Sequence, residues 1–276
     1  MNNDQKDVFQ TDIFFYYPYG WYNLTIEMKV NYMKICITGL NGTVAPATAN
    51  HLASLGHVII PFNRDYVDIK SEKAVLAILK EVSPDWVIHF AMGSIEWTKM
   101  LAALTKNEAI KFMYISTVMV FDGQTQQGPH HIEDKPQPKE TYGLHKYESE
   151  QAVIKLNPDA SIVRLGWQIG HVPGSNQMID YLEKEMKAHG VVKASKKAFP
   201  ASSFLTDSAL AIAQILTMKP DLYMVDSNDG VSLYDIFTYL SHIHPWIKVI
   251  EEADVAWNNQ MIDPRIKIRK FSKFMK

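Results

Sequence analysis

Cysteine is almost absent from this chain of 276 residues, because Cys36 is the only one. A single cysteine cannot form an internal disulfide, and the chain shows no signal peptide, so we expect a reducing cytoplasm as its location. The aromatic-dense stretch at residues 13–22 is far too short to span a bilayer. Neither sign of charge predominates, since the net charge is −2. The balance therefore favours neither a nucleic acid nor a membrane surface as partner.

What is present fits a packed globular protein. Apolar residues make up 47% of the chain and charged residues 21%, which is enough apolar surface for a sizeable core. The length suits one large α/β unit or two small domains. Cys36 lies inside the apolar run 33–38, so we expect it to be a buried small hydrophobe rather than a nucleophile.

A tyrosine and a lysine four residues apart form the first candidate site. If residues 141–146 open a helix, Tyr142 and Lys146 share a face. A nearby cation lowers the pKa of a tyrosine, which suits a group that exchanges a proton with a substrate oxygen. The same spacing also occurs at Tyr66 and Lys70, so the surrounding sequence must distinguish the two.

The segment 33–55 supplies part of that context. An apolar run, a turn with Gly39 and Gly42, and an apolar-periodic segment ending before Gly56 follow one another. Strand, glycine turn and helix together place backbone N–H groups and a helix N-terminus against a pyrophosphate. Pro46 falls in the first helical turn, where its missing N–H costs little. An ordinary strand–turn–helix without a ligand is the alternative.

Two hydroxyl residues end the apolar run 112–117. Ser116 and Thr117 occupy the carboxyl end of this run, and ligands bind outside such strand ends in open α/β sheets. Thr117 precedes Tyr142 by 25 residues. Alternatively, both hydroxyls bond the backbone of the next loop.

Elsewhere strands and helices alternate, which predicts an α/β fold with a doubly wound parallel sheet of Rossmann type. The expected strands are 33–38, 58–60, 86–88, 112–117 and 161–165, and the expected helices are 46–55, 73–82, 96–104 and 142–155. Three later helices are expected. Ser175 would cap a helix at 178–188, Thr206 would cap one that ends at Leu216, and Ser232 would cap one that ends at Leu240.

In this order the motifs resemble those of the extended short-chain dehydrogenases/reductases. The chain carries Thr-Gly-x-x-Gly-x-x-Ala at 38–45, Ser-Thr before Val-Phe-Asp-Gly at 116–123, and Tyr-Gly-x-x-Lys at 142–146. Within that superfamily it is similar to the dTDP-4-dehydrorhamnose reductase branch, through segments 128–136, 149–152, 164–167 and 199–207. The resemblance runs from about residue 33 to the C-terminus.

The resemblance implies NAD(P)H-dependent reduction of a keto group on a nucleotide-linked deoxysugar. It implies an N-terminal extension (1–32), a dinucleotide-binding domain (33–167) and a smaller, mainly substrate-binding lobe (168–276) with returns to the main sheet. Tyr142 would be the proton donor, Lys146 would hold the ribose and Thr117 would orient the carbonyl, which gives the catalytic set Thr117, Tyr142 and Lys146. The implied cofactor contacts are Gly39, Asn41, Gly42, Thr43, Val44, Asn63, Arg64, Asp68, Ala91, Tyr142 and Lys146. The implied substrate contacts are Thr117, Trp167 and Asn176; an ordinary core position is the alternative for Trp167.

The end of the second strand bears on the choice of cofactor. NAD enzymes place an acidic residue there, whereas an arginine accommodates the 2′-phosphate of NADP. Asn63 and Arg64 at this point favour NADPH over NADH. The alternative is a surface Arg64 paired with Asp65.

The chain also departs from the family pattern. Ala45 stands where a third glycine is usual, and Val118 and Met119 replace the usual Asp-Tyr. Ser116 follows His89 by only 27 positions, so a loop that normally borders the nicotinamide and substrate is shortened. A catalytically idle dinucleotide- or sugar-nucleotide-binding regulatory subunit is therefore the rival function. A dehydratase would need an acidic pair after the threonine, which Val118 and Met119 do not provide.

Two regions stay open. Residues 1–32 could dock on the domain or on a partner, or form a poorly ordered tail, or come from an upstream mis-start. Residues 130–134 contain two histidines and two carboxylates, but lack the spacing of a metal site, so we expect a solvated loop and no metal. A homodimer is left open.

Overall fold

A sheet of six parallel strands forms the centre of the protein in the computed structural model, which describes residues 8–17, 20–29, 32–123 and 127–275. The strand order is β12-β7-β6-β5-β3-β4. The strands are β3 (Lys34–Thr38), β4 (Val58–Phe62), β5 (Trp86–His89), β6 (Lys111–Thr117), β7 (Ser161–Leu165) and β12 (Leu222–Val225). From β3 the chain adds β4 on one side, and it then adds β5 on the other side of β3. The strand order therefore reverses between β3 and β5, and ligands bind at such a point in open α/β sheets.

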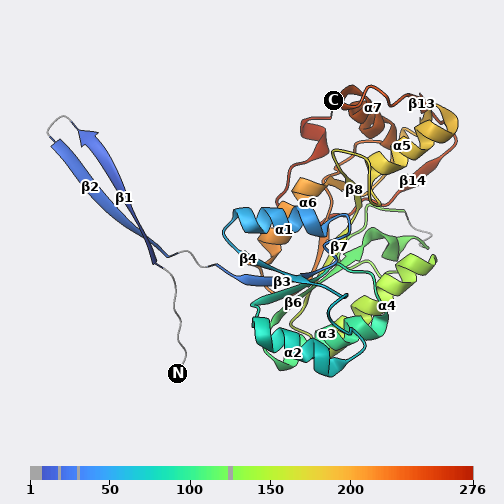
Figure 1. The fold of residues 1–276 in the computed structure, drawn as a ribbon. Helices are drawn as coiled ribbons and strands as arrows, with labels where there is room; N and C mark the ends of the chain where they lie inside the picture. The colour runs from blue at the N-terminus through green and yellow to red at the C-terminus, as the bar shows by residue number, and fades with distance from the viewer. Residues whose placement is uncertain (1–7, 18–19, 30–31, 124–126, 276) are drawn as a thin grey trace.

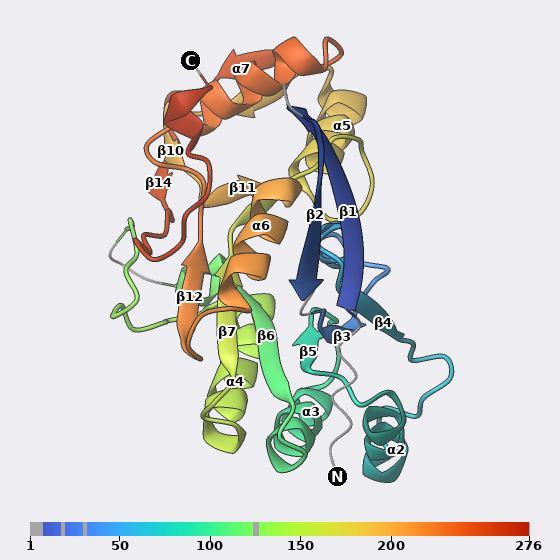
Figure 2. The ribbon, with the colours of Figure 1, turned by 90° about the vertical axis from the view of Figure 1, so that its left-hand side faces the viewer.

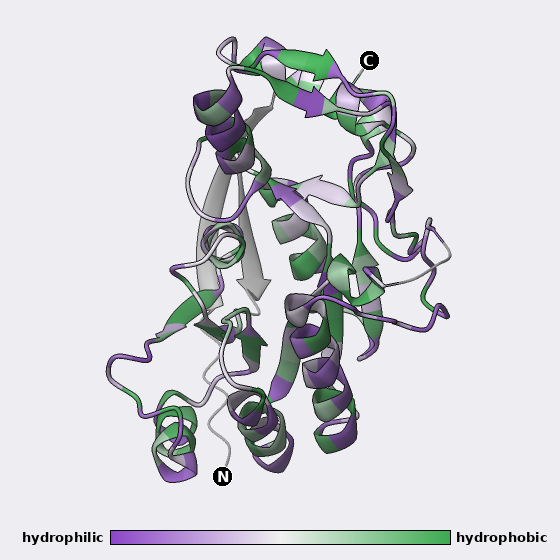
Figure 3. Ribbon diagram, turned by 90° about the vertical axis from the view of Figure 1, so that its right-hand side faces the viewer, coloured by the Kyte–Doolittle hydropathy of each residue, from purple (hydrophilic) through white to green (hydrophobic). Residues whose placement is uncertain are grey.

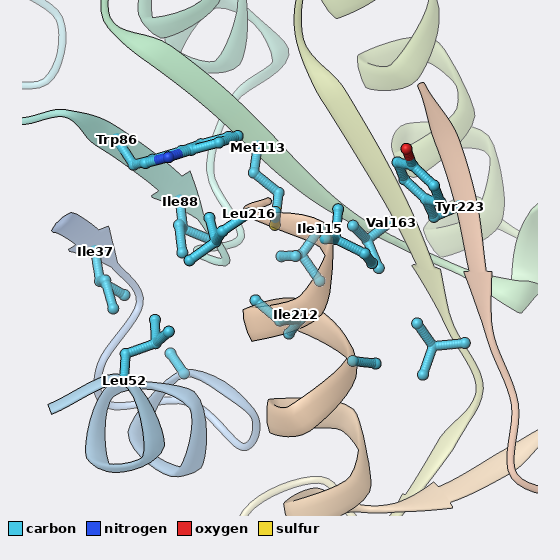
Figure 4. Close-up of a cluster of buried hydrophobic side chains, with 14 of the residues drawn as sticks. Ile37, Leu52, Trp86, Ile88, Met113, Ile115, Val163, Ile212, Leu216 and Tyr223 are labelled. Atoms are coloured by element: carbon cyan, nitrogen blue, oxygen red, sulfur yellow. The ribbon is translucent and has the colours of Figure 1, made fainter. Parts of the chain in front are cut away.

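Side chains alternate between the two faces of this sheet, as the pleat of a strand requires. Ile35 and Ile37 of β3 pack on one face, and Cys36 between them packs on the other. Figure 4 shows the first of these clusters, in which residues of β3, β5, β6 and β7 meet α1 (Ala45–Ser54) and α6 (Leu205–Ile215). Cys36 is fully buried and burial raises its pKa to about 12, so the prediction of an inert core residue is confirmed.

The opposite face is covered by α2 (Glu72–Val82), α3 (Ile95–Asn107) and α4 (Thr141–Leu156). Figure 1 shows α1 and α6 on one side of the sheet and these three helices on the other. In Figure 3 the helices at the bottom carry both hydrophilic and hydrophobic residues, as expected of helices with one face on a core. The predicted doubly wound α/β fold is confirmed.

A smaller lobe lies beyond one end of the sheet (Figure 2). Its helices are α5 (Met178–His189) and α7 (Leu233–Ile243), and they share an apolar cluster. Three pairs of short parallel strands surround them: β8 (Trp167–Ile169) with β11 (Ser202–Phe204), β9 (Val192–Ala194) with β13 (Val249–Glu251), and β10 (Lys197–Phe199) with β14 (Ala256–Asn258). After β11 the chain returns to the main sheet as β12. Single turns of 3₁₀ helix occur at η1 (Val118–Phe121) and η2 (Phe271–Lys273).

The helix starts test the predicted caps. Ser232 caps α7 by accepting a hydrogen bond from the Asp235 N–H, as predicted. The prediction for Ser175 is wrong, because Gln177 accepts the bond from Ile179 that caps α5, and Ser175 adopts a positive φ of 61° in the loop before it. Thr206 is not a cap either, since α6 begins one residue earlier, at Leu205.

The N-terminal residues form an antiparallel hairpin of β1 (Val8–Tyr17) and β2 (Gly20–Lys29), drawn in dark blue in Figure 1. Residues 18 and 19, within the aromatic-dense stretch, lie outside the described residues. No helix in the described part of the chain has the length and apolar character needed to cross a membrane.

Candidate functional site

A cavity of about 740 Å³ opens at the carboxyl ends of β3, β5 and β6. Most of the site residues predicted from the sequence line it, although they come from separate parts of the chain. These are Gly39, Asn41, Gly42, Thr43, Val44, Arg64, Ala91, Thr117, Tyr142, Lys146, Trp167 and Asn176. Asn63 and Asp68 do not line it: Asn63 accepts a hydrogen bond from the Asp65 N–H (2.9 Å), and Asp68 accepts one from the Lys70 N–H (3.0 Å). Both close local turns instead.

The glycine turn forms one wall of the cavity. Gly39 has a φ of +81°, and a Cβ on it would lie 2.8 Å from the backbone nitrogen of Ala91. Only glycine allows both the conformation and this approach. Behind the turn, α1 begins without a side-chain cap and without an acidic residue in its first turn. The positive end of the helix dipole therefore meets the cavity unopposed, which suits an anion.

A buried histidine network fixes the facing loop. Thr38 accepts a hydrogen bond from the Ala91 N–H (3.1 Å) and contacts His89 Nδ1 (2.8 Å), while His89 Nε2 contacts Thr98 (3.2 Å). Burial, with smaller contributions from Lys146 and His145, lowers the pKa of His89 to about 3, so the ring is neutral at physiological pH. This histidine thus ties the loop after β5 to β3, and Thr38 holds Ala91 against Gly39.

The start of α4 is held by contacts that place Tyr142. Asp122 accepts hydrogen bonds from the backbone N–H groups of Lys139 and Glu140, directly before the helix. A Cβ on Gly143 would lie 2.2 Å from the carbonyl oxygen of Met119, so only glycine lets α4 pack this closely against η1. The close packing brings Tyr142 beside Thr117, the residue before η1.

Interaction with the Thr117 hydroxyl acts to lower the pKa of Tyr142. Desolvation of the hydroxyl acts in the other direction and is larger, so the pKa of Tyr142 is raised overall. The predicted lowering by Lys146 is therefore wrong in the isolated chain. Tyr142 as a residue is nevertheless 44% exposed, and it lines the cavity.

Lys146 lies on the same helical face but bonds elsewhere. Its ammonium donates to the carbonyl of Ile115 (2.9 Å) and stands over the ring of Tyr114 (4.9 Å). Burial lowers the pKa of Lys146 to about 8, and the nearby Glu150 opposes this shift. Glu150 is itself buried and paired in two hydrogen bonds with Arg164 (3.0 and 2.7 Å). The lysine is therefore a buried cation at the floor of the cavity.

Arg64 reaches the cavity from the loop after β4. Its guanidinium donates to the carbonyl of Met92 (3.4 Å) and not to Asp65, the partner considered from the sequence. Its exposed position on the glycine-turn side of the cavity leaves most of its donors for a ligand.

The far wall of the cavity was not predicted from the sequence. It includes Gln168, Pro200, Ala201, Trp257 and Asn259, contributed by the lobe. The segment at 199–207 did signal the branch resemblance, but Trp257 and Asn259 belong to no motif. Their spacing of two residues at the end of a short strand, which gives them a common face, was the only available signal.

In the loop at 130–134, His131 and Glu133 are exposed as expected, but His130 differs from the expectation. His130 is buried and stacks on Phe121 at 4.2 Å between ring centroids, so it is a core residue and not a solvated one. Among the described residues no group of three or more histidine, cysteine or acidic side chains could hold a metal ion. A larger groove of about 1270 Å³ lies along α6 and the C-terminal segment, and none of the predicted site residues lines it.

Comparison with known proteins identifies the family. The model of the RmlD substrate binding domain matches residues 33–93 and 94–221. The chain belongs to this family. The match includes the glycine turn, the strand-end hydroxyls and the tyrosine–lysine pair.

Individual relatives are distant. The spore coat polysaccharide biosynthesis protein SpsK of Bacillus subtilis is 22% identical over 221 residues, which cover 74% of this chain and 77% of that protein. A dTDP-4-dehydrorhamnose reductase of Burkholderia thailandensis is 32% identical over 151 residues, covering 49% of this chain and 50% of the enzyme. The chain thus aligns with about half the length of that reductase.

Among solved structures, the dTDP-4-dehydrorhamnose reductase of Bacillus anthracis in complex with NADP superposes with a TM-score of 0.73 at 19% identity, covering 88% of this chain and 97% of that one. The corresponding reductase of Clostridium acetobutylicum gives a TM-score of 0.69 at 25% identity, covering 80% and 84%. These similarities establish the shared fold.

Proposed function

We propose that the protein reduces a keto group on a nucleotide-linked deoxysugar with NADPH as the reductant. The observation that carries the proposal is the meeting of Thr117, Tyr142 and Lys146 with the glycine turn in one cavity. Relatives named dTDP-4-dehydrorhamnose reductase and dTDP-4-keto-6-deoxy-D-glucose reductase support the substrate class. We propose a cytoplasmic location for the enzyme, and the single buried cysteine supports this location.

The cavity fits a nicotinamide dinucleotide. Its glycine-turn wall offers an uncapped helix start, and Gly39 lets the turn lie directly against the backbone of Ala91. The buried hydroxyl of Ser116, which also lines the cavity, has no hydrogen-bond partner among the described residues. Buried polar groups are rarely left unpaired, so a polar ligand group is its expected partner. Gly42, Arg64 and Lys146 would hold the cofactor, and Arg64 would read the 2′-phosphate.

The chemistry of the chain's own residues is proton donation and orientation. A bound nicotinamide supplies the hydride. Tyr142 donates its phenolic proton to the carbonyl oxygen of the substrate as that oxygen becomes an alcohol. Thr117 donates a hydrogen bond that orients the same oxygen, and Lys146 would hold the ribose of the cofactor. The raised pKa of Tyr142 keeps it protonated before reaction, which is the form that a proton donor needs.

Tyr142→Phe tests the proposal because it keeps the ring and removes the proton. With dTDP-4-dehydrorhamnose as substrate, the rate of NADPH oxidation should fall by about 10²–10⁴-fold, as for the loss of a general acid. The Kd of NADPH should change little, because Lys146 and the glycine turn remain. Wild type that oxidises no NADPH with any 4-keto sugar nucleotide, or Tyr142→Phe that matches wild type, would refute the reductase.

The second candidate is a regulatory subunit that binds a dinucleotide or sugar nucleotide without turnover. The short connection after β5 favours it, because α3 begins at Ile95, six residues beyond the strand. One relative, the beta subunit of methionine adenosyltransferase 2 of Xenopus tropicalis, is named as a subunit and is 23% identical over 177 residues. NADPH binding by calorimetry without ketone reduction would select this candidate.

A further inference from the structure

We infer that Trp257 and Asn259 determine substrate specificity by forming a neutral wall against the keto-sugar ring; this inference rests on the proposed function. Both residues line the cavity, and they are two positions apart around the end of β14. Successive side chains on a strand point to opposite faces, so these two share a face. Asn258 between them is not part of the cavity lining and accepts a hydrogen bond from the Gln260 N–H (2.9 Å).

The backbone of this segment is held from two sides. On one side β14 pairs with β10, and the Asn259 N–H donates to the Phe199 carbonyl (3.1 Å). On the other side the Gly128 N–H donates to the Asn258 carbonyl (2.8 Å). A wall fixed in this way can discriminate between ligands, because a preorganised site loses little entropy on binding.

Trp257 does not belong to the hydrophobic core of the described residues. It is half-buried, belongs to none of the apolar clusters of the described residues, and has no ring partner among them. Trp167, which also lines the cavity, differs in this respect, because it packs against Tyr181 and Phe237 at 5.3 and 6.4 Å between ring centroids. A large aromatic face left on a cavity wall is a surface for a flat apolar ligand face.

Asn259 presents a hydrogen-bond donor. Its Oδ1 accepts from the Ala201 N–H (2.7 Å), which fixes the orientation of the amide. Its NH₂ group has no partner among the described residues and remains free for a substrate hydroxyl. By contrast, Gln168 on the same wall is fully engaged, since it donates to Gly166 and accepts from Ser208.

A short series of backbone contacts connects Asn259 of this wall with the catalytic candidate Thr117. Thr117 is the register partner of Leu165 on β7, and Trp167 follows two residues later. The Trp167 N–H donates to the carbonyl of Ala201 (2.7 Å), and the N–H of Ala201 donates to Asn259. This continuity places the wall beside the ketone and not at the far end of the nucleotide.

Charge supports the same assignment. Among the described residues that line the cavity, Arg64 and Lys146 are the cations, and neither belongs to the lobe wall. The wall of Trp167, Gln168, Pro200, Ala201, Trp257 and Asn259 carries no formal charge. A diphosphate would be poorly matched there, whereas a sugar ring, with an apolar face and hydroxyls at its rim, is well matched.

The test compares Trp257→Ala, Trp257→Phe and Asn259→Asp with Trp246→Phe, a half-exposed tryptophan outside the cavity. Trp257→Ala should raise the KM for dTDP-4-dehydrorhamnose about tenfold, the effect of losing an aromatic contact and its buried area, with little change in kcat. Trp257→Phe should restore most of the loss. Asn259→Asp keeps the acceptor for Ala201 but removes the donor, so it should raise the KM and leave the Tm near that of wild type.

A second readout is independent of turnover. Titration with dTDP-rhamnose should quench tryptophan fluorescence in wild type and in Trp246→Phe, and the quenching should be reduced in Trp257→Phe. The Kd of dTDP alone should be unchanged by Trp257→Ala. If wild type binds dTDP-rhamnose with this pattern but reduces no ketone, the reductase proposal fails and the wall assignment stands. Equal losses of dTDP and dTDP-rhamnose affinity, unchanged KM and quenching in Trp257 variants, or no binding of dTDP-rhamnose by wild type would each overturn the wall.

Discussion

The two walls of the cavity are built in different ways. The wall from the main sheet consists of a glycine turn, a helix start and two cations, and it presents backbone N–H groups and positive charge. The wall from the lobe presents tryptophan, proline and amide side chains on short paired strands and carries no formal charge. In the proposed function, the main-sheet wall would recognise phosphate through the backbone, which any sequence with the right glycines can provide. The lobe wall would recognise ring shape and hydroxyls through side chains, so we expect it to be the wall that changes with the substrate.

The largest expected effect is a loss of NADPH affinity caused by a substitution in the main-sheet wall alone. Gly39→Ala forces a side chain into a left-handed conformation and places its Cβ 2.8 Å from Ala91, so the Kd of NADPH should rise by about 100-fold or more. The affinity for dTDP-rhamnose, which we assign to the lobe wall, should stay within a factor of a few. Calorimetry with each ligand measures both.

Gly42→Ala is the matched control for this change. A Cβ there would approach the Gly39 carbonyl at 3.1 Å, and Gly42 has no positive φ, so its effect on NADPH affinity should be clearly smaller. Equal effects of the two substitutions would show that the tight approach of Gly39 to Ala91 does not shape the cofactor wall.

A smaller effect is expected from Arg64, which tests whether the main-sheet wall distinguishes NADPH from NADH. Arg64→Ala should weaken NADPH about tenfold while leaving NADH nearly unchanged, because a surface-exposed guanidinium–phosphate contact is lost for only one of the two. Arg64→Lys keeps the charge without the fork of donors and should recover part of the affinity. Titrations of both cofactors decide the point, and equal losses for NADPH and NADH would mean that Arg64 does not read the phosphate.

The same contrast explains how much of the site could be predicted from the sequence. The main-sheet wall depends on backbone geometry, which short local motifs encode. The glycines at 39 and 42, the strand-end Thr117 and the pair Tyr142 and Lys146 are such motifs, and all of them line one cavity. Long buried strands with regular helices between them are also the elements that periodicity reveals best.

The lobe wall was hidden because its strands are only three residues long and its contacts join segments more than 50 residues apart, such as Ala201 with Asn259. Local rules also failed where tertiary contacts decided the outcome. The Gln177 side chain accepts hydrogen bonds from the Gly170 N–H and from the Ile179 N–H at the start of α5. Gln177 therefore caps the helix in place of Ser175. For Tyr142, desolvation by the packed helix outweighs the effect that spacing alone suggested.

The smallest expected effect tests the electrostatics of the cavity floor. Lys146 is the buried cation there, and burial lowers its pKa to about 8. Its ammonium is therefore mostly protonated at pH 7, and the charge is lost as pH rises through about 8. NADPH is an anion, so its Kd should be nearly flat from about pH 6 to 7 and should rise a few-fold between about pH 7 and 9.

Lys146→Met keeps much of the length of the side chain but cannot be charged. Its affinity for NADPH should be weaker than that of wild type at neutral pH and should not change further across the same pH range. Binding of dTDP-rhamnose at the neutral wall should show no such step in either protein. A wild-type Kd for NADPH that is flat over the whole range, or a step that persists in Lys146→Met, would show that the charge on Lys146 does not contribute to cofactor binding. The cofactor wall would then rely on Arg64 and the start of α1 for its attraction to phosphate.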